Sequence, residues 1–340
     1  MKKAVCVGTG LVALDIILNG NPKTPPKFYT GGSCGNVLSI LSYLGWASYP
    51  IARLDNDKAT TKILSDLKRW DVKRDLISVT DDGSTPIIIH RILKDKAGNP
   101  KHRFEFKDPE TKEWLPSYKP VLSKKVIDIA QKLSFTPNVF YFDRVNRASI
   151  NLAKLYNSEG ALVFFEPSSM GDNKLFMEAA SASHIIKFSS DRISNYRKLF
   201  KKSIATLEIE TLGAKGLKFR YSKNKNSESW HAIDPIKVDN LIDFAGAGDW
   251  CSAMVINLLG KAGKFGFQKK NISDIISALY QAQHLSVLNC FFDGARGIMY
   301  NLEINRVKSF LTILKSSKKV DFGQFLSSKK IRKPDRESLK

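Results

Sequence analysis

Short, mostly apolar runs separated by segments of helical periodicity constrain the fold of this chain more than any other feature. Four such runs occupy residues 4–8, 139–142, 162–165 and 185–188, and residues 204–209 predict another strand. Strands that are buried on both faces of a sheet are mostly apolar, and their alternation with helices is typical of a parallel, doubly wound sheet. We therefore expect an α/β protein with three layers, in which helices cover both faces of a mostly parallel central sheet.

A glycine-rich stretch, Asp-Phe-Ala-Gly-Ala-Gly-Asp at residues 243–249, precedes a long apolar segment that we expect to be a helix. Small residues at a helix N-terminus leave backbone N–H groups bare, and the helix dipole makes that end attractive to an anion. A carboxylate next to such a seat suits phosphoryl transfer, because Asp249 can take the proton of an attacking hydroxyl group. The alternative is an ordinary glycine-rich loop with an acidic residue at the helix start.

This stretch resembles the C-terminal signature of the ribokinase family of carbohydrate kinases, also called PfkB-type kinases. The resemblance implies a ribokinase fold with Asp249 as the catalytic base. It also implies that the amides of Gly246, Ala247 and Gly248 form the anion hole. Phe244 stands where the family usually has threonine, a departure that touches neither the base nor the anion hole.

A second glycine-rich stretch, residues 31–36, precedes an expected helix that runs through Leu44. It resembles the N-terminal signature of the same family, which implies that Gly31, Gly32 and Asn36 bind the phosphoryl acceptor. By the same resemblance, Asp15 is a substrate-binding residue. The alternative for Asn36 is a helix cap at a glycine-rich connection.

The segment after the first strand, Gly-Thr-Gly-Leu-Val-Ala at residues 8–13, matches a dinucleotide-binding fingerprint, but we reject that interpretation. The fingerprint needs a helix there and an acidic residue roughly 20 positions later. Instead, Asp15 interrupts the apolar segment, prolines follow, and the next acidic residue is Asp55.

Residues that resemble the family's nucleotide site occur in two places. Thr211, Gly213 and Gly216 follow the expected strand at 204–209, although a plain hairpin turn is the alternative. Asn289 and Gly294 follow the last long helical segment and are further expected nucleotide contacts. For Arg296 we expect a surface position, with a phosphate ligand as the alternative.

Polar residues at the ends of the expected parallel strands are candidate ligand contacts, since ligands bind at the carboxyl ends of such strands. They are Asp143, Arg144, Glu166 and Lys187. The alternative is that they solvate loops and cap helices.

The resemblance implies ATP as phosphoryl donor, with Mg²⁺, but the family's Asn-x-x-Glu motif is replaced by Ser-Ser-Asp-Arg at residues 189–192. Glu166 or Asp191 can take the place of the motif's glutamate as a carboxylate that contacts the metal ion through a water molecule. A monovalent cation such as K⁺ is expected near Asp243. A second departure is the absence of the family's glycines near residues 55–57.

The β-rich segments at 84–116, together with residues 12–30, predict a small β-sheet lid, which in similar proteins often also forms a homodimer surface. A lid excludes water, so that ATP is not hydrolysed in place of transfer. We expect a kinase domain at residues 1–313 and a basic C-terminal tail at 314–340.

The formal net charge is +21, from 54 Lys and Arg against 33 Asp and Glu. The basic residues are scattered lysines for the most part, which indicates solvated helix faces. No nucleic-acid recognition element is evident, and no stretch is apolar enough to span a membrane. The four cysteines have no paired spacing and the N-terminus does not read as a signal peptide, so we expect a cytoplasmic protein.

Taken together, these motifs predict a kinase that transfers the γ-phosphate of ATP to a hydroxyl group of a sugar, with a primary alcohol as the expected acceptor. A nucleoside kinase of the same family is one alternative. A sugar- or nucleotide-binding regulatory protein with weak catalysis is another, motivated by the departures at residues 189–192 and 55–57.

Overall fold

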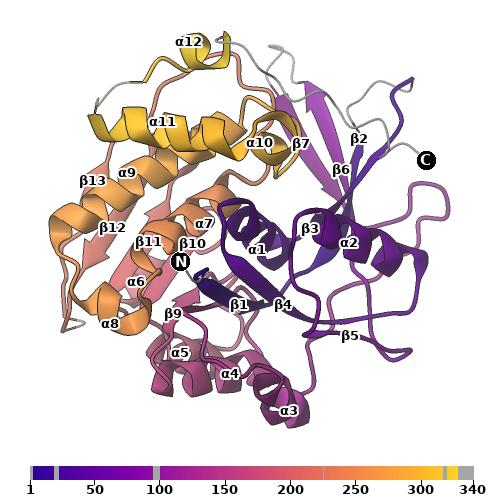
Figure 1. The fold of residues 1–340 in the computed structure, drawn as a ribbon, viewed down its shortest axis with the longest axis horizontal. Helices are drawn as coiled ribbons and strands as arrows, with labels where there is room; N and C mark the ends of the chain where they lie inside the picture. The colour runs from indigo at the N-terminus through magenta and orange to yellow at the C-terminus, as the bar shows by residue number, and fades with distance from the viewer. Residues whose placement is uncertain (1–2, 19–22, 95–99, 225, 317–319, 328–340) are drawn as a thin grey trace.

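The computed structural model describes residues 3–18, 23–94, 100–224, 226–316 and 320–327 (Figure 1). The strands are β1 Val5–Thr9, β2 Ala13–Leu18, β3 Lys27–Gly31, β4 Ala47–Leu54, β5 Ile77–Val79, β6 Ile87–Lys94, β7 Pro100–Glu105, β8 Val139–Phe142, β9 Leu162–Phe165, β10 Ile185–Ser189, β11 Leu207–Thr211, β12 Leu217–Tyr221 and β13 His231–Ile233. The α-helices are α1 Ser33–Tyr43, α2 Lys58–Arg69, α3 Val126–Gln131, α4 Arg147–Ser158, α5 Asn173–Ser181, α6 Tyr196–Leu199, α7 Ala247–Leu259, α8 Gly263–Gln268, α9 Ile272–Asn289, α10 Gly297–Asn301, α11 Ile304–Ser316 and α12 Phe322–Ser327. Two short 3-10 helices, η1 Ser123–Lys125 and η2 Gly213–Lys215, complete the elements.

The central sheet has the strand order β13-β12-β11-β10-β9-β8-β1-β4-β5. Neighbouring strands from β11 through β5 pair in parallel, whereas β11–β12 and β12–β13 are antiparallel. The expectation of a mostly parallel α/β sheet is therefore confirmed.

Alternating side chains of the buried strands divide the core between the two faces of this sheet. In β8, Tyr141 packs in the core layer that contains α1, α2, α7 and α9, while Phe140 and Phe142 pack in the layer that contains α3 to α6. Because successive side chains of a strand point to opposite faces, a strand with both faces covered must be apolar throughout. Figure 1 shows the two helix layers on opposite sides of the sheet, as the three-layer expectation requires.

A separate four-stranded sheet with the order β3-β2-β6-β7 lies beside the central domain, at the upper right of Figure 1. It is built from the two segments in which we expected a lid, so the expected small sheet is present. In it, β2 pairs in parallel with β6 and antiparallel with β3, and β6 pairs antiparallel with β7.

Two local details have clear physical causes, and the first differs from the sequence expectation. The strand expected at 204–209 begins later, at Leu207, because the backbone N–H groups of Ile204 and Ala205 donate to Glu208 Oε1 at 2.5 and 3.0 Å. Asp57, in the segment without the family's glycines, caps α2 by accepting from the N–H of Thr60 at 2.7 Å.

The expected boundary at residue 313 falls inside α11. Leu314 is buried, and Phe322 and Phe325 of α12 pack in the same core layer as α9. The described part of the segment after residue 313 is therefore packed on the domain, while the basic run at 329–333 lies outside the described residues.

Along the described part of the chain, no helix combines the length and the apolar character needed to cross a lipid bilayer.

Candidate active site

The expected anion seat has a defined backbone conformation at the start of α7. Gly246 precedes the helix in the left-handed conformation, with φ 73°. A Cβ atom at this position would lie 2.0 Å from the carbonyl oxygen of Ala295, so the close approach of the two loops requires glycine. Asp249 lies in the first turn of α7, next to the amides of Gly246, Ala247 and Gly248.

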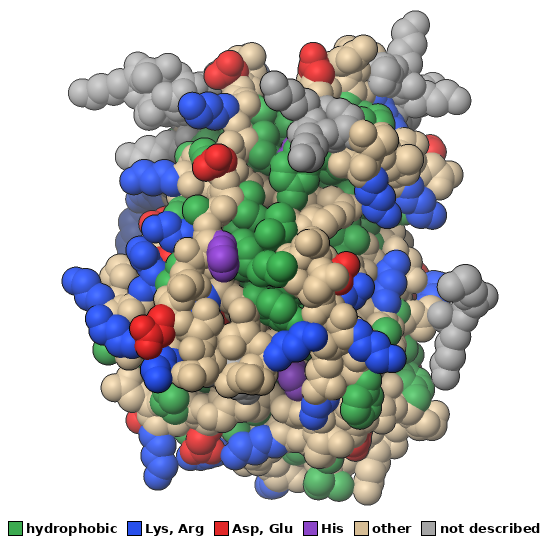
Figure 2. All heavy atoms as spheres, turned by 90° about the vertical axis from the view of Figure 1, so that its left-hand side faces the viewer, with side chains coloured by type: hydrophobic (Ala, Val, Ile, Leu, Met, Phe, Trp, Pro, Cys, Tyr) green, Lys and Arg blue, Asp and Glu red, His purple; other side chains and the backbone are tan. Residues whose placement is uncertain are grey.

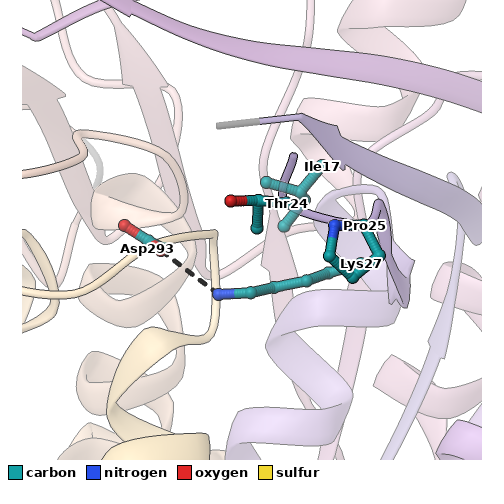
Figure 3. Close-up of a pocket in the computed structure, with 5 residues that line it drawn as sticks. All are labelled: Ile17, Thr24, Pro25, Lys27 and Asp293. Atoms are coloured by element: carbon teal, nitrogen blue, oxygen red, sulfur yellow. Dashed lines mark hydrogen bonds and ion pairs between the residues drawn. The ribbon is translucent and has the colours of Figure 1, made fainter. Parts of the chain in front are cut away.

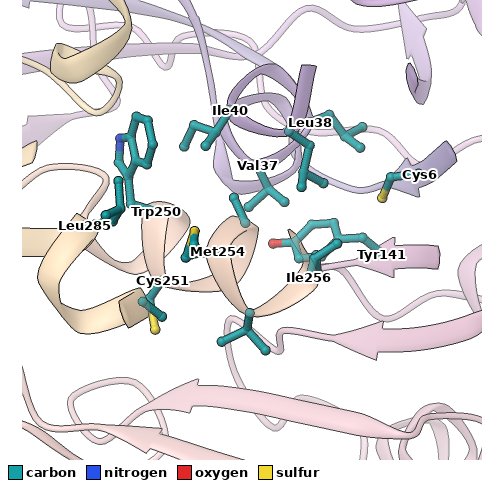
Figure 4. Close-up of a cluster of buried hydrophobic side chains, with 14 of the residues drawn as sticks. Cys6, Val37, Leu38, Ile40, Tyr141, Trp250, Cys251, Met254, Ile256 and Leu285 are labelled. Atoms are coloured by element: carbon teal, nitrogen blue, oxygen red, sulfur yellow. The ribbon is translucent and has the colours of Figure 1, made fainter. Parts of the chain in front are cut away.

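The helix that carries Asp249 is fixed by its burial. Trp250 and Met254 of α7 are fully buried and face Val37 and Ile40 of α1 in the cluster shown in Figure 4. Each large apolar side chain that is removed from water contributes roughly 1.5–3 kcal/mol. The packing of α7 on α1 therefore holds the N-terminal turns of the two helices in a fixed relation.

That relation brings the two glycine-rich signatures together. Asn36, in the first turn of α1 and 4% exposed, donates a hydrogen bond from Nδ2 to Asp249 Oδ2 at 2.8 Å. The residues are 213 positions apart in the sequence. Asp249 is half-buried, so this hydrogen bond lies partly shielded from solvent.

The environment of Asp249 makes it a stronger base than an ordinary aspartate. Burial, followed by the neighbouring Glu166 carboxylate, raises the pKa of Asp249 to about 8. The hydrogen bond from Asn36 and the charges of Lys187 and Arg192 act in the opposite direction. A base with a pKa near the working pH is efficient at proton transfer.

Asp15, the expected acceptor ligand, lies on β2 against the glycine that leads into α1. A Cβ atom at Gly31 would lie 1.9 Å from the carboxyl carbon of Asp15, so only glycine admits this side chain. Burial raises the pKa of Asp15 to about 7, opposed by the charge of Arg296. Gly32 has φ 75°, and a Cβ there would meet the carbonyl oxygen of Leu11 at 2.4 Å.

Two acceptor atoms in this region have no hydrogen-bond partner among the described residues: Oδ1 of Asp15 and Oδ1 of Asn36. Both atoms are buried, and a buried polar atom without a partner costs about 1–3 kcal/mol. Hydroxyl groups of a bound polyol would donate to such atoms. This feature agrees with the acceptor-binding role that we expected for both residues.

Arg296 is not on the surface, so that expectation was wrong. The side chain is 1% exposed and its Nη2 lies 2.5 Å from Oδ2 of Asp66 on α2. The guanidinium group also lies over the ring of Tyr300. A buried arginine needs such partners, and nothing in the sequence near Arg296 indicated Asp66, which lies 230 positions earlier.

The nucleotide segment after β11 forms a tight turn. Gly213 and Gly216 have φ values of 57° and 86°, and a Cβ at Gly216 would meet the carbonyl oxygen of Ile233 at 2.4 Å. Thr211, the last residue of β11, donates from Oγ1 to the carbonyl oxygen of Phe188 at 3.3 Å. Both glycines are thus required by the turn itself, and the nucleotide contacts of this segment stay a prediction.

Asp243 and Asn289 hold the loop at residues 243–248, which we call the anion loop, against the segment after α9. The Asp243 carboxylate accepts from the N–H groups of Ala245 and Gly294, each at 2.7 Å. Asn289 donates from Nδ2 to the carbonyl oxygens of Ala245, at 3.0 Å, and Gly294, at 3.3 Å, and accepts from the N–H of Ile298. Both side chains are fully buried, so in this structure they position backbone. The expected cation contact of Asp243 and the expected nucleotide contacts of Asn289 and Gly294 stay predictions.

The two expected metal residues lie in different surroundings. Glu166 accepts a hydrogen bond from Lys187 Nζ at 2.5 Å, and Asp191 is exposed. Within the described ranges, no three His, Cys, Asp or Glu side chains gather as a metal site would require. Mg²⁺ is often held by substrate phosphates and water with one or two carboxylates. The residues present fit a magnesium ion of that kind, and not one held in an all-protein cage.

The small sheet β3-β2-β6-β7 contacts the anion-loop region directly. Lys27 on β3 forms an ion pair with Asp293 at 3.2 Å, at the edge of a small pocket lined also by Ile17, Thr24 and Pro25 (Figure 3). A Cβ at the next residue, Gly294, would lie 2.8 Å from Cδ1 of Ile17. The strand that carries Asp15 therefore packs on the loop that Asp243 holds.

A face at right angles to the view of Figure 1 gathers hydrophobic side chains near its centre, with lysine and arginine side chains around them (Figure 2). It is the side of the molecule where β12, β13 and α9 lie in Figure 1. The basic side chains visible on this face are spread rather than gathered in one patch. This agrees with the interpretation of the lysine excess as solvated surface.

Comparison of the sequence with protein-family models and with curated proteins finds no match. Solved structures do match. Fructokinase from Xylella fastidiosa with bound ATP is 17% identical with a TM-score of 0.71, and the match covers 93% of this chain and 100% of that chain. Fructokinase from Vibrio cholerae O395, in a fructose, ADP and calcium ion bound form, is 20% identical with a TM-score of 0.63, over 87% of this chain and 96% of that one.

A nucleoside-type kinase matches as well. Aminoimidazole riboside kinase from Salmonella enterica, complexed with aminoimidazole riboside and an ATP analog, is 15% identical with a TM-score of 0.63. That match covers 90% of this chain and 99% of the other. The neighbours are thus kinases of the ribokinase family, and the chain has the ribokinase fold, as its two signatures led us to expect.

Proposed function

We propose that this protein is an ATP-dependent kinase that phosphorylates a hydroxyl group of a sugar, with Asp249 as the catalytic base. The single observation that carries the proposal is the hydrogen bond between Asn36 and Asp249, at 2.8 Å. This bond places the expected acceptor ligand, Asn36, in contact with the proposed base, Asp249, next to the amides expected to bind the transferring phosphoryl group. The ATP-bound fructokinase among the structural neighbours supports the donor, and the neighbours with fructose or a riboside support the acceptor class.

In the proposed reaction, the acceptor hydroxyl lies between Asp15, Asn36 and Asp249. Its oxygen attacks the γ-phosphorus of ATP as its proton passes to Asp249. The new oxygen–phosphorus bond forms while the bond from the γ-phosphorus to the bridging oxygen breaks, and ADP leaves with that electron pair. The amides of Gly246, Ala247 and Gly248 stabilise the charge on the transferring group. Mg²⁺ bound with ATP would neutralise phosphate charge.

Asp249 must be ionised to act as a base, and its raised pKa makes it able to accept the hydroxyl proton near neutral pH. Asn36 holds the carboxylate in place through Oδ2, so the other oxygen, Oδ1, can face the acceptor. Asp15 and Asn36 each offer an unpartnered oxygen to further hydroxyl groups of the same molecule. Paired hydrogen bonds of this kind discriminate between polyols that differ in one hydroxyl group.

The test is an ADP-release assay with a panel of sugars and nucleosides, with product detection by mass spectrometry. We expect a phosphorylated sugar with wild-type protein, and turnover lower by about two to four orders of magnitude with Asp249→Asn. Phosphorylation of nucleosides alone would favour a nucleoside kinase. Binding of ATP and sugar without any product, at high protein concentration, would favour a regulatory protein and contradict the proposal.

Two further properties are proposed with this function. The four cysteines are all free and buried, which supports a reducing compartment such as the cytoplasm. The lid exposes large apolar side chains, with Phe28 at 40% and Phe104 at 53%, which supports a homodimer through this sheet. Light scattering after size-exclusion chromatography tests the dimer, and a monomer at micromolar concentration would contradict it.

A further inference from the structure

A buried cluster of four polar side chains lies next to the anion loop and is not used in the mechanism above. We call it the lysine cluster: Lys187 on β10, Glu166 after β9, Tyr141 on β8 and Ser252 on α7. Lys187 Nζ donates to Glu166 Oε1 at 2.5 Å. The other carboxylate oxygen of Glu166 accepts from Ser252 Oγ at 2.5 Å and from Tyr141 OH at 2.9 Å.

The ammonium group of Lys187 lies at the anion loop itself. A Cβ atom at Gly248 would be 3.6 Å from Lys187 Nζ, and no other described side chain or distant backbone lies within 4 Å of that position. Gly248 is the last residue of the expected anion hole. The positive charge is thus close to the place where the amides would bind the transferring phosphoryl group.

The charge of Lys187 is maintained although its side chain is only 2% exposed. Burial is the largest influence and lowers the pKa of Lys187, but the charge and hydrogen bond of Glu166, together with Cys251 and Asp249, outweigh it, so the pKa is raised. An ammonium group has three N–H donors. Glu166 Oε1 accepts from one of them, and no further acceptor for Lys187 occurs among the described residues.

Glu166 does not depend on Lys187 alone. Its second oxygen accepts two hydroxyl hydrogen bonds, one of them from the helix that carries Asp249. The carboxylate therefore stays anchored if the ammonium group shares its donors with another anion. A lysine that only filled space on this buried strand would be replaced at lower cost by an apolar side chain.

We propose that Lys187 is a further catalytic residue, whose ammonium group contacts the γ-phosphoryl group of ATP at the anion loop while Glu166 holds it in position. The inference rests on the proposed kinase function. It gives the site a protein cation next to the segment 189–192, where the family's metal-handling motif is replaced. Arg192 in that segment also acts electrostatically on Asp249.

The test compares nucleotides that differ only in the γ-phosphate. We measure binding of ADP and of the β,γ-imido analogue of ATP, both with Mg²⁺, by calorimetry. For Lys187→Met we expect the analogue to bind about 10- to 100-fold more weakly, as the loss of a charged hydrogen bond implies. Binding of ADP should change by no more than about twofold. Equal weakening of both nucleotides, or no change in either, would overturn the proposal.

A second variant guards against a folding defect, because Lys187→Met leaves a buried carboxylate without its cation. The double variant Lys187→Met/Glu166→Gln removes both charges and should show the same selective loss of the analogue. Lys154→Met is the matched control, since Lys154 pairs with Glu178 at 3.2 Å on the surface. Thermal unfolding of each variant verifies the fold.

The outcome also separates this inference from the proposed function. Selective loss of the analogue by the Lys187 variants, in a protein that phosphorylates no acceptor, would support the contact and contradict the kinase. Phosphorylation that persists with unchanged analogue binding in the variants would support the kinase and overturn the contact. Wild-type protein that binds neither nucleotide would overturn both.

Discussion

Replacing the proposed base should stabilise the fold while it removes activity. Asp249 has a pKa raised from 3.8 to about 8, chiefly by burial. The folded protein therefore holds a proton on this group at pH values where the unfolded chain has lost it. The contribution of this bound proton to the free energy of unfolding is fully present below the unfolded pKa of Asp249. It is lost as the pH rises towards 8, by up to about 1.4 kcal/mol per pH unit.

Asp249→Asn removes that penalty, because asparagine is neutral and its side-chain oxygen can still accept the hydrogen bond from Asn36. Water entry and rearrangement of the site make the free energy of unfolding depend less steeply on pH. We therefore expect the variant to gain roughly 2 kcal/mol relative to wild type between pH 5 and pH 8, about half of the full value. Function and stability oppose each other at this position.

The assay is urea unfolding of both proteins at pH 5 and pH 8, with the difference in the free energy of unfolding taken at each pH. Asp191→Asn is the control, since Asp191 is exposed and its replacement should leave the difference unchanged with pH. An Asp249→Asn variant that is less stable than wild type at pH 8, or a difference that does not change with pH, would show that the charge of Asp249 does not destabilise the folded state.

Three further predictions concern the same site. The kcat/KM for phosphorylation should rise about tenfold per pH unit and level off near pH 8, because Asp249 must be ionised; a flat profile from pH 6 to 9 would contradict this. Asn36→Leu removes a hydrogen bond that lowers the pKa of Asp249, so this limb of the profile should move to higher pH, and an unmoved limb would argue against the contact. Gly246→Ala should lower turnover at least tenfold, because its Cβ would meet Ala295 O at 2.0 Å; the control Gly171→Ala has a similar positive φ in open space and should retain activity.

The sequence was sufficient for the parts of the fold that depend on local pattern. Continuous apolar runs predicted the buried strands, and the small residues at 246–248 predicted the bare helix start that the structure contains. The expectation that Asn36 and Asp249 belong to one site followed from two signatures whose order and spacing resemble one family, but the hydrogen bond between them was not predicted. Local rules were enough in these cases because backbone conformation and burial periodicity are local properties.

Contacts between distant segments were beyond reach of the sequence. Arg296 was expected at the surface because nothing near it indicated a partner, yet Asp66 on α2 receives its guanidinium group. Asp243 and Asn289 hydrogen-bond to the backbone of neighbouring loops, contacts that nothing in the sequence indicated, while their expected ligand contacts stay predictions. A polar residue at a strand or helix end can bind a ligand or hydrogen-bond to nearby backbone, and only the three-dimensional structure shows which backbone groups it reaches. Lys187 had one signal, its place at the end of a parallel strand.

The most direct test of the central claim compares wild-type protein with Asp249→Asn in one phosphotransfer experiment. Both are incubated with ATP, Mg²⁺ and a mixture of small polyols, and new phosphorylated products are identified by mass spectrometry. We expect a phosphorylated sugar that forms with wild type and with the surface control Asp128→Asn, whose side chain is 58% exposed, and that falls by at least a hundredfold with Asp249→Asn. Equal product from wild type and Asp249→Asn would contradict the role of Asp249 as the base. No product from wild type on a panel that contains both sugars and nucleosides would contradict the kinase function.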